Sequence, residues 1–182
     1  NDVHCAVDGY ARLAAVRSGQ YALTPYVATV SCGDFVQGGV VGSVTRGEAI
    51  VDIMNRVGYD VVVPGNHEFD YGMARFFELV EMAEFPYISC NFVKDGAPVF
   101  APYIIKEFDG VKVAFVGIST PKTITSSTPT YFQDENGNYV YGFCQDDTGA
   151  KFYAAIQSAV DAARADGAQY VIACGHLGTE ET

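Results

Sequence analysis

The segment 65–70, Gly-Asn-His-Glu-Phe-Asp, constrains the possible folds of this chain more than any other segment. It follows the apolar run 61–63 after a single proline, Pro64. A short β-branched run that ends in Pro-Gly and continues into polar side chains predicts a buried strand with functional groups at its C-terminal end. Asn66 offers a carbonyl oxygen, His67 a proton-transferring imidazole, and Asp70 a carboxylate that can orient that imidazole. Taken alone, the segment is equally compatible with an ordinary turn and a solvated histidine.

Other predicted strands end in the same kind of side chain. The apolar run 27–32 leads into Asp34, and the run 169–174 leads into His176. Asp2 and His4, two positions apart, lie on one face of an extended segment. Each signal alone has a structural explanation, such as a turn aspartate or a chance Asp-x-His pair. Together they predict one metal site, because unrelated turns rarely produce four such strand ends.

The remaining pattern predicts an alternating β/α domain. Helices are expected at 11–16, 47–57, 73–83 and 150–165, and strands at 27–32, 59–63, 87–92, 103–108, 111–118 and 169–174. Asp109-Gly110 predicts an antiparallel hairpin between two of these strands. The segment 121–143 is expected to be a long surface excursion with a small hairpin at Asn136-Gly137. No repeat or interdomain linker is visible, so residues 1–182 are interpreted as one domain.

Composition excludes several classes of protein. A net charge of −11 and a pI near 4.5 disfavour binding to a nucleic-acid polymer, although a small phosphate compound can bind through a cation. The five cysteines contain no C-x-x-C pair, which disfavours a disulfide framework or a zinc ribbon. No apolar run is long enough for a transmembrane helix, and no signal peptide is present. The abrupt start suggests a fragment that lacks its first strand, so the missing signal peptide says little about location.

Carboxylate, amide and imidazole donors suit borderline divalent ions such as Mn, Zn, Fe or Co, and disfavour a calcium or thiolate site. With the motifs Asp-x-His, Gly-Asp, Gly-Asn-His-Glu and Gly-His in place, the chain resembles the calcineurin-like metallophosphoesterase superfamily. More narrowly, it resembles the N-terminal domain of the bacterial 5′-nucleotidase and 2′,3′-cyclic-nucleotide phosphodiesterase family. The resemblance covers nearly the whole chain. It implies an α/β fold, a four-layer αββα sandwich of the metallo-dependent phosphatase type that is incomplete at both ends.

The resemblance also implies roles for individual residues. Two divalent metal ions are expected, whose ligands are Asp2, His4, Asp34, Asn66 and His176. The first two residues hold one ion, the last two hold the other, and Asp34 bridges them. The implied catalytic residues are His67, which stabilises developing charge or protonates the leaving oxygen, and its partner Asp70. The implied reaction is in-line attack on phosphorus by a hydroxide that bridges the two ions. No substrate-binding residue is assigned.

The expected substrates are nucleoside 5′-monophosphates or 2′,3′-cyclic nucleotides, in an extracytoplasmic location that the resemblance alone implies. Two alternatives remain: the same site acting on a sugar phosphate or thiosulfate adduct, or a non-catalytic exported binding domain. The family's final Gly-His-x-His motif and its C-terminal nucleotide-binding domain are absent from residues 1–182, although that domain is expected in the full-length protein. We therefore expect this chain to bind metal weakly and to turn over poorly. Tyr131 and Phe132 either stack a base or cover the core, and core packing is the favoured explanation.

Overall fold

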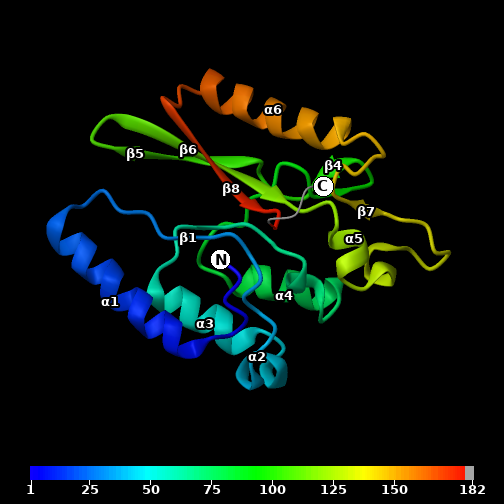
Figure 1. Ribbon diagram of the computed structural model, residues 1–182, viewed down its shortest axis with the longest axis horizontal. Coiled ribbons are helices and arrows are strands. Elements are labelled where there is room, and N and C mark those ends of the chain that lie inside the picture. Colours follow the sequence, from blue (N-terminus) through cyan, green and yellow to red (C-terminus); the bar gives the residue numbers. More distant parts are fainter. Residues whose placement is uncertain (179–182) are drawn as a thin grey trace.

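The computed structural model describes residues 1–178 and arranges them in four layers (Figure 1). Helix α6 (Ala150–Ala165) covers one face of a sheet formed by β5 (Tyr103–Phe108), β6 (Val111–Ser119) and β8 (Tyr170–His176). The third layer contains β1 (Val30–Ser31) and β2 (Val61–Val62), and the fourth contains α1 (Val7–Leu23), α3 (Glu48–Val57) and α4 (Met73–Met82). This αββα arrangement confirms the expected fold class.

Shorter elements complete the chain between these layers. They are α2 (Val40–Thr45), η1 (His67–Phe69), β3 (Val93–Lys94), β4 (Ala97–Pro98), α5 (Thr123–Ser126), η2 (Pro129–Phe132) and β7 (Tyr141–Gly142). Strand β3 lies between β4 and β7 in a small antiparallel sheet. None of the helices in the described part of the chain is long and apolar enough to cross a membrane.

Alternation along the strands separates the apolar side chains into the spaces between layers. In the third layer, Val61 and Val63 pack between the two sheets, whereas Val62 packs toward the helices. In the second layer, Phe115 faces the other sheet, whereas Ala114 packs in the cluster that contains the α6 residue Ala163. Successive strand residues point to opposite faces, and here both faces are covered. The apolar run 61–63 is therefore buried throughout.

The predicted hairpin is confirmed. Strands β5 and β6 pair antiparallel around Asp109 and Gly110, which both have positive φ, and β8 pairs parallel with the other side of β6. The register places His176 opposite Ser119, at the end of β6. Because β6 and β8 run parallel, the end of β8 lies at the edge of the sheet where β6 also ends.

The prediction of a regular strand at 87–92 is wrong. This segment makes only isolated bridges, because it passes between the two sheets and bonds to both. The Ile88 N–H donates to the carbonyl of Val62, and the Cys90 N–H donates to that of Gly117. A Cβ atom on Gly117 would lie 2.3 Å from the Ile88 carbonyl oxygen, so glycine permits this close passage.

Two further expectations differ from the structure, and one helix was not expected. Helix α1 extends well beyond 11–16 and passes through Gly19, a position where a Cβ atom would have open space around it. Helix α2 was not predicted, because its three valines are exposed and give no amphipathic pattern. The segment 121–143 is only partly a surface excursion, since Ile124 and Phe132 are buried in the core.

Phe132 contacts the rings of Phe69 and Phe143, which confirms core packing for this residue. Tyr131, its neighbour, is 37% exposed. The expected turn at Asn136-Gly137 is present, and Gln133 and Tyr139 form an antiparallel bridge across it.

Candidate metal centre

The centre is built where β1 and β2 end. These strands are parallel neighbours, so their C-terminal ends lie at one edge of the sheet, where open α/β sheets hold their ligands. The turn that follows β1 touches the turn that follows β2, and a Cβ atom on Gly33 would lie only 2.3 Å from the Gly65 nitrogen. This close approach allows Asp34 Oδ1 to accept a hydrogen bond of 2.9 Å from the His67 N–H.

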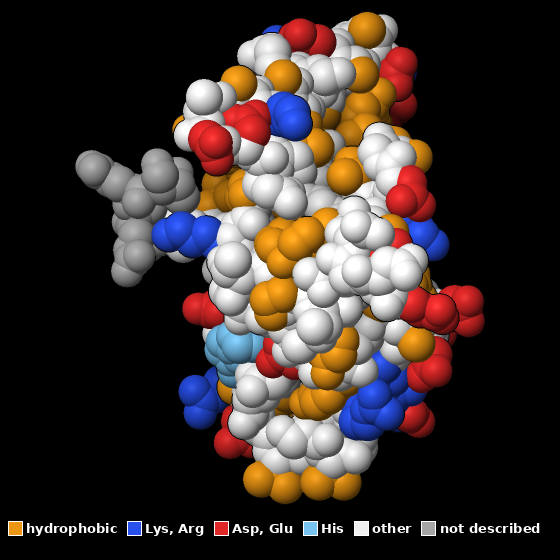
Figure 2. Space-filling model, turned by 90° about the vertical axis from the view of Figure 1, so that its right-hand side faces the viewer, with side chains coloured by type: hydrophobic (Ala, Val, Ile, Leu, Met, Phe, Trp, Pro, Cys, Tyr) orange, Lys and Arg blue, Asp and Glu red, His pale blue; other side chains and the backbone are white. Residues whose placement is uncertain are grey.

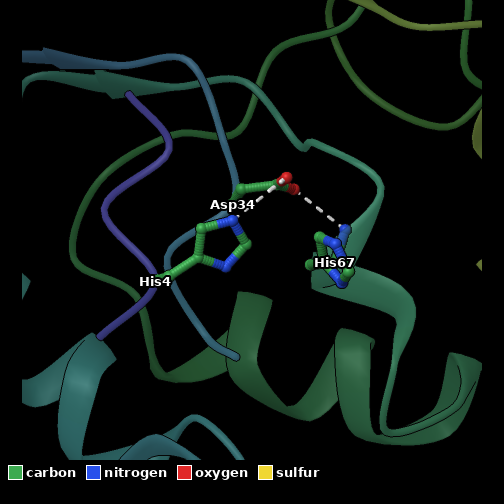
Figure 3. A group of neighbouring side chains, drawn as sticks. All are labelled: His4, Asp34 and His67. Atoms are coloured by element: carbon green, nitrogen blue, oxygen red, sulfur yellow. Dashed lines mark hydrogen bonds and ion pairs between the residues drawn. The ribbon is translucent and has the colours of Figure 1, made fainter. Parts of the chain in front are cut away.

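Asp34 occupies the middle of the centre, and its side chain is 4% exposed. On one side, His4 Nε2 lies 4.0 Å from Asp34 Oδ2 (Figure 3). The same nitrogen lies 3.2 Å from Asp2 Oδ1. On the other side, His176 Nε2 lies 3.1 Å from Asp34 Oδ2 and 3.2 Å from Asn66 Oδ1. The same carboxylate is therefore within reach of both donor groups.

Backbone carbonyls orient the two histidines beside Asp34. His4 Nδ1 lies 3.1 Å from the Gln37 carbonyl oxygen, and His176 Nδ1 lies 2.7 Å from that of Cys32. An imidazole that donates its Nδ1–H to a carbonyl keeps its Nε2 lone pair for a cation, as is usual for histidine ligands. Carboxylate, amide and imidazole donors with this orientation fit a borderline divalent metal ion.

Without a cation, Asp34 and His176 form an ion pair. Burial by itself lowers the pKa of His176, but its hydrogen bond to the Asp34 carboxylate outweighs burial and raises that pKa to about 9. Burial also opposes ionisation of Asp34, yet the hydrogen bonds from the His176 ring and the His67 N–H bring its pKa below the ordinary aspartate value. A cation at Nε2 must displace this proton, so metal binding is coupled to pH.

The pair His67 and Asp70 is partly exposed and lies beside His4. His67 Nδ1 is 2.7 Å from Asp70 Oδ2, and the His67 ring meets the His4 ring edge to face at 5.1 Å between centroids. Burial lowers the pKa of His67, but the hydrogen bond and charge of Asp70 raise it overall. A ring nitrogen of His67 also lies within 4.8 Å of ligand atoms of His4 and Asp34. Distance alone therefore does not show whether His67 acts as a general acid or as a metal ligand.

Every site residue expected from the sequence thus lies in this one region. The chain has three histidines, and all three belong to it, so the pale blue side chains in Figure 2 mark where it reaches the surface, beside acidic groups. The backbone is also strained here, because Asp2, His4 and Asp34 all have positive φ. Strained non-glycine residues of this kind cluster at functional sites.

Sequence reasoning missed the role of Glu68. Its side chain is buried and accepts three backbone hydrogen bonds, from the N–H groups of Asp34 (2.8 Å), Phe35 (2.8 Å) and Gly65 (2.6 Å). Burial raises the pKa of Glu68, and the neighbouring Asp34 charge adds to that effect, whereas the hydrogen bonds oppose it. The available signal was an acidic residue next to two buried strand ends whose turn N–H groups need acceptors. Glu68 joins the two turns that carry the centre.

Known proteins resemble this chain in sequence and in fold. The chain is 29% identical to a 5′-nucleotidase from Bos taurus, over 96% of this chain and 29% of that protein. It superimposes on the sulfate thiohydrolase SoxB from Thermus thermophilus with a TM-score of 0.76 at 30% identity, covering 91% of this chain and 29% of SoxB. A 5′-nucleotidase precursor, also from Thermus thermophilus, gives a TM-score of 0.75 at 28% identity, over 93% of this chain and 31% of that protein.

The chain therefore spans less than a third of the length of these relatives. The bovine match also shows that the resemblance extends beyond bacterial proteins. The family model described as calcineurin-like phosphoesterase matches residues 1–181. This chain belongs to the calcineurin-like phosphoesterase family.

Proposed function

We propose that this chain is the metal-binding domain of a hydrolase that cleaves nucleoside 5′-monophosphates or 2′,3′-cyclic nucleotides with two divalent metal ions. The observation that carries the proposal is the position of Asp34, whose carboxylate is within reach of both donor groups. In the proposed assignment, Asp2 and His4 hold one ion and Asn66 and His176 hold the other. When bound, such ions activate water for in-line attack on phosphorus and neutralise developing charge.

The chain's own residues then position and protonate the substrate. The hydrogen bond to Asp70 fixes the His67 ring and keeps it protonated to higher pH, because it raises the His67 pKa. A protonated His67 donates through its other ring nitrogen to a phosphate oxygen or to the departing ester oxygen, which is general acid catalysis. Hydrogen bonds of Glu68 to the two glycine turns fix Asp34 and His67 relative to each other.

Nucleotides are favoured as substrates because two of the compared relatives are named 5′-nucleotidases. The likeness to a sulfate thiohydrolase supports a second candidate, hydrolysis of a thiosulfate adduct at the same site. A sugar phosphate, or an exported binding domain without catalysis, is the remaining alternative. We further propose an extracytoplasmic location, since one relative is named a precursor. A C-terminal nucleotide-binding domain is proposed to complete the active protein, so that this chain alone binds metal weakly.

The test is phosphate release from AMP with and without Mn, measured on this chain and on the full product of its gene. We expect the full product to release phosphate only with Mn and to lose this activity in His67→Ala, while the surface variant Glu81→Ala keeps wild-type activity. This chain alone should turn over poorly. A parallel panel contains cyclic nucleotides, a sugar phosphate, an aryl phosphate and a thiosulfate adduct. Hydrolysis of the adduct alone would favour the second candidate. No hydrolysis of any compound with any metal would favour the alternative of a binding domain without catalysis.

A further inference from the structure

A buried polar network lies beside the metal centre, between the two sheets. Its three side chains, each 0% exposed, are those of Ser89, Asn91 and Ser119. Ser119 is the last residue of β6, whereas the other two belong to the segment 87–92 that passes between the sheets. Buried polar groups cost free energy unless they are hydrogen-bonded, so the partners of this network show what it holds in place.

Asn91 binds both backbone groups of Ser119. Its Nδ2 donates to the Ser119 carbonyl at 2.7 Å, and its Oδ1 accepts from the Ser119 N–H at 2.9 Å. The same Nδ2 donates to the Phe143 carbonyl at 3.0 Å. Because a carbonyl can only accept, these contacts fix which end of the amide is the donor. Asn91 thus holds the end of β6 in the manner of a neighbouring strand.

The hydroxyl of Ser119 reaches the other sheet. It donates to the Pro64 carbonyl at 2.9 Å and so connects the end of β6 with the turn that follows β2. A hydroxyl has one proton, so Ser89 is the donor in its 3.1 Å contact with Ser119 Oγ. It shares that proton with Asn91 Oδ1 at 3.2 Å and accepts from the Phe92 N–H at 3.2 Å. The bond to Pro64 is therefore the one that leads from this network to the metal centre.

The peptide group between Pro64 and Gly65 is held on both sides. Its carbonyl accepts from the Ser119 hydroxyl, and its N–H donates to Glu68 Oε2 at 2.6 Å. Fully satisfied buried hydrogen bonds of this kind restrict a peptide to one orientation. This peptide directly precedes Asn66, so its orientation determines where the Asn66 side chain begins.

The two partners of this peptide relate it to different ligands. Glu68 also accepts from the Asp34 N–H, so it positions the peptide relative to Asp34. Ser119 lies opposite His176 in the register of β6 and β8, so it positions the peptide relative to His176. Asn66 Oδ1 and His176 Nε2 lie 3.2 Å apart and are directed at the same space.

We propose that Ser119 is a positioning residue, whose hydroxyl fixes Asn66 relative to His176 and thereby determines the affinity for the ion that these two residues hold. This inference rests on the proposed function, because it uses the assignment of those residues to one ion. The N–H groups of Asp2 and His4 donate to the turn after β1 instead, so the affinity for the other ion should not depend on Ser119.

The test measures Mn affinity by calorimetry in two backgrounds of the full gene product. In His4→Ala the proposed site of Asn66 and His176 remains, and there we expect Ser119→Ala to lower Mn affinity about tenfold, as lost partners of metal ligands do. In Asn66→Ala the proposed site of Asp2 and His4 remains, and there Ser119→Ala should leave Mn affinity unchanged. A general loosening of the fold would lower the affinity in both backgrounds.

Ser89→Ala is the matched control. It removes a second hydroxyl of the same network, also 0% exposed, whose partners are Asn91, Phe92 and Ser119 instead of Pro64. We expect similar losses of stability for Ser89→Ala and Ser119→Ala in urea titrations, whereas Mn affinity falls only in Ser119→Ala. Ser119→Cys keeps a weak donor, so its Mn affinity should lie between those of wild type and Ser119→Ala. If Ser119→Ala does not fold, the comparison of Ser119→Cys with Ser89→Ala decides in its place.

Equal loss of Mn affinity in both backgrounds, or the same loss in Ser89→Ala, would overturn the proposal. Unchanged Mn binding in Asn66→Ala would contradict the ligand assignment and the positioning role with it. If AMP is hydrolysed with Mn but Ser119→Ala shows no selective loss, the positioning role is wrong and the proposed function stands. If the selective loss is found and no nucleotide is hydrolysed, the positioning role stands and the proposed reaction fails.

Discussion

The two halves of the metal centre are held in different ways. Asp34 belongs to a buried half, in which the side chain of Glu68 accepts hydrogen bonds from both glycine turns and is itself buried. Asp2 and His4 belong to an exposed half, and the Asp2 side chain is 59% exposed against 4% for that of Asp34. The exposed half is tied to the buried one by hydrogen bonds from the Asp2 and His4 N–H groups to the carbonyls of Gly33 and Asp34.

This difference indicates that the position of the exposed half depends on the buried half. The buried half is positioned by strand ends, close backbone contact and buried hydrogen bonds, so the fold itself places Asp34. The exposed half takes its position from the buried half. Damage to the buried half should therefore cost both folding and metal binding, whereas damage to the exposed half should cost metal binding alone.

The largest effect is expected from Glu68→Ala. This change leaves three buried N–H groups without their acceptor, and each such group costs about 1–3 kcal/mol. We expect the free energy of unfolding to fall by about 3 kcal/mol or more in urea titrations. Glu81→Ala, an exposed change on α4, is the control and should stay within about 0.5 kcal/mol of wild type. A small change in the free energy of unfolding of Glu68→Ala would contradict the inference that the fold positions the buried half.

Gly33→Ala tests the close contact between the two turns. Its new Cβ would meet the Gly65 backbone at 2.3 Å, and its φ of +88° is itself unfavourable for alanine. Gly137→Ala is the matched control, with a φ of +82° and nothing within 4 Å. We expect the control to lose about 1 kcal/mol of stability from strain alone. Gly33→Ala should lose about 2 kcal/mol more from the clash, measured by the same titration. Equal losses would contradict the contact.

The smallest effect on stability is expected from His4→Ala in the exposed half. It removes one partly buried hydrogen bond, to the Gln37 carbonyl, together with the exposed contact to Asp2 and the ring contact with His67, so the free energy of unfolding should fall by only about 1 kcal/mol. Calorimetric titration with Mn should nevertheless show affinity reduced at least about tenfold, because even partners of metal ligands have effects of that size. Asp8→Ala, an exposed change in the first turn of α1, is the control for both measurements. A loss of stability as large as that of Glu68→Ala would contradict the division into halves.

Local patterns were sufficient for the expected strand ends and for the residue types gathered at them. The run 61–63 indicated burial on both faces, and the polar residues after it indicated the sheet edge. The family resemblance supplied the four-layer arrangement and the individual roles of Asp2, Asp34 and His176 as metal ligands. The burial of the run 61–63 and the hairpin at Asp109-Gly110 could be predicted because alternation and turn residues involve neighbouring positions of the chain.

Contacts between distant segments were decided only by the tertiary structure. The sequence identifies Glu68 as acidic, but its acceptor role depends on two turns that meet after β1 and β2 have paired. The segment 87–92 has the sequence pattern of an ordinary strand. Its N–H groups donate to carbonyls of both sheets, so it does not form a regular strand in either. Lys122 and Tyr153 are 31 positions apart and line one cavity because α6 packs against β6 and β8. Periodicity reports which side of an element is buried, whereas the partner on that side is set when the layers pack together.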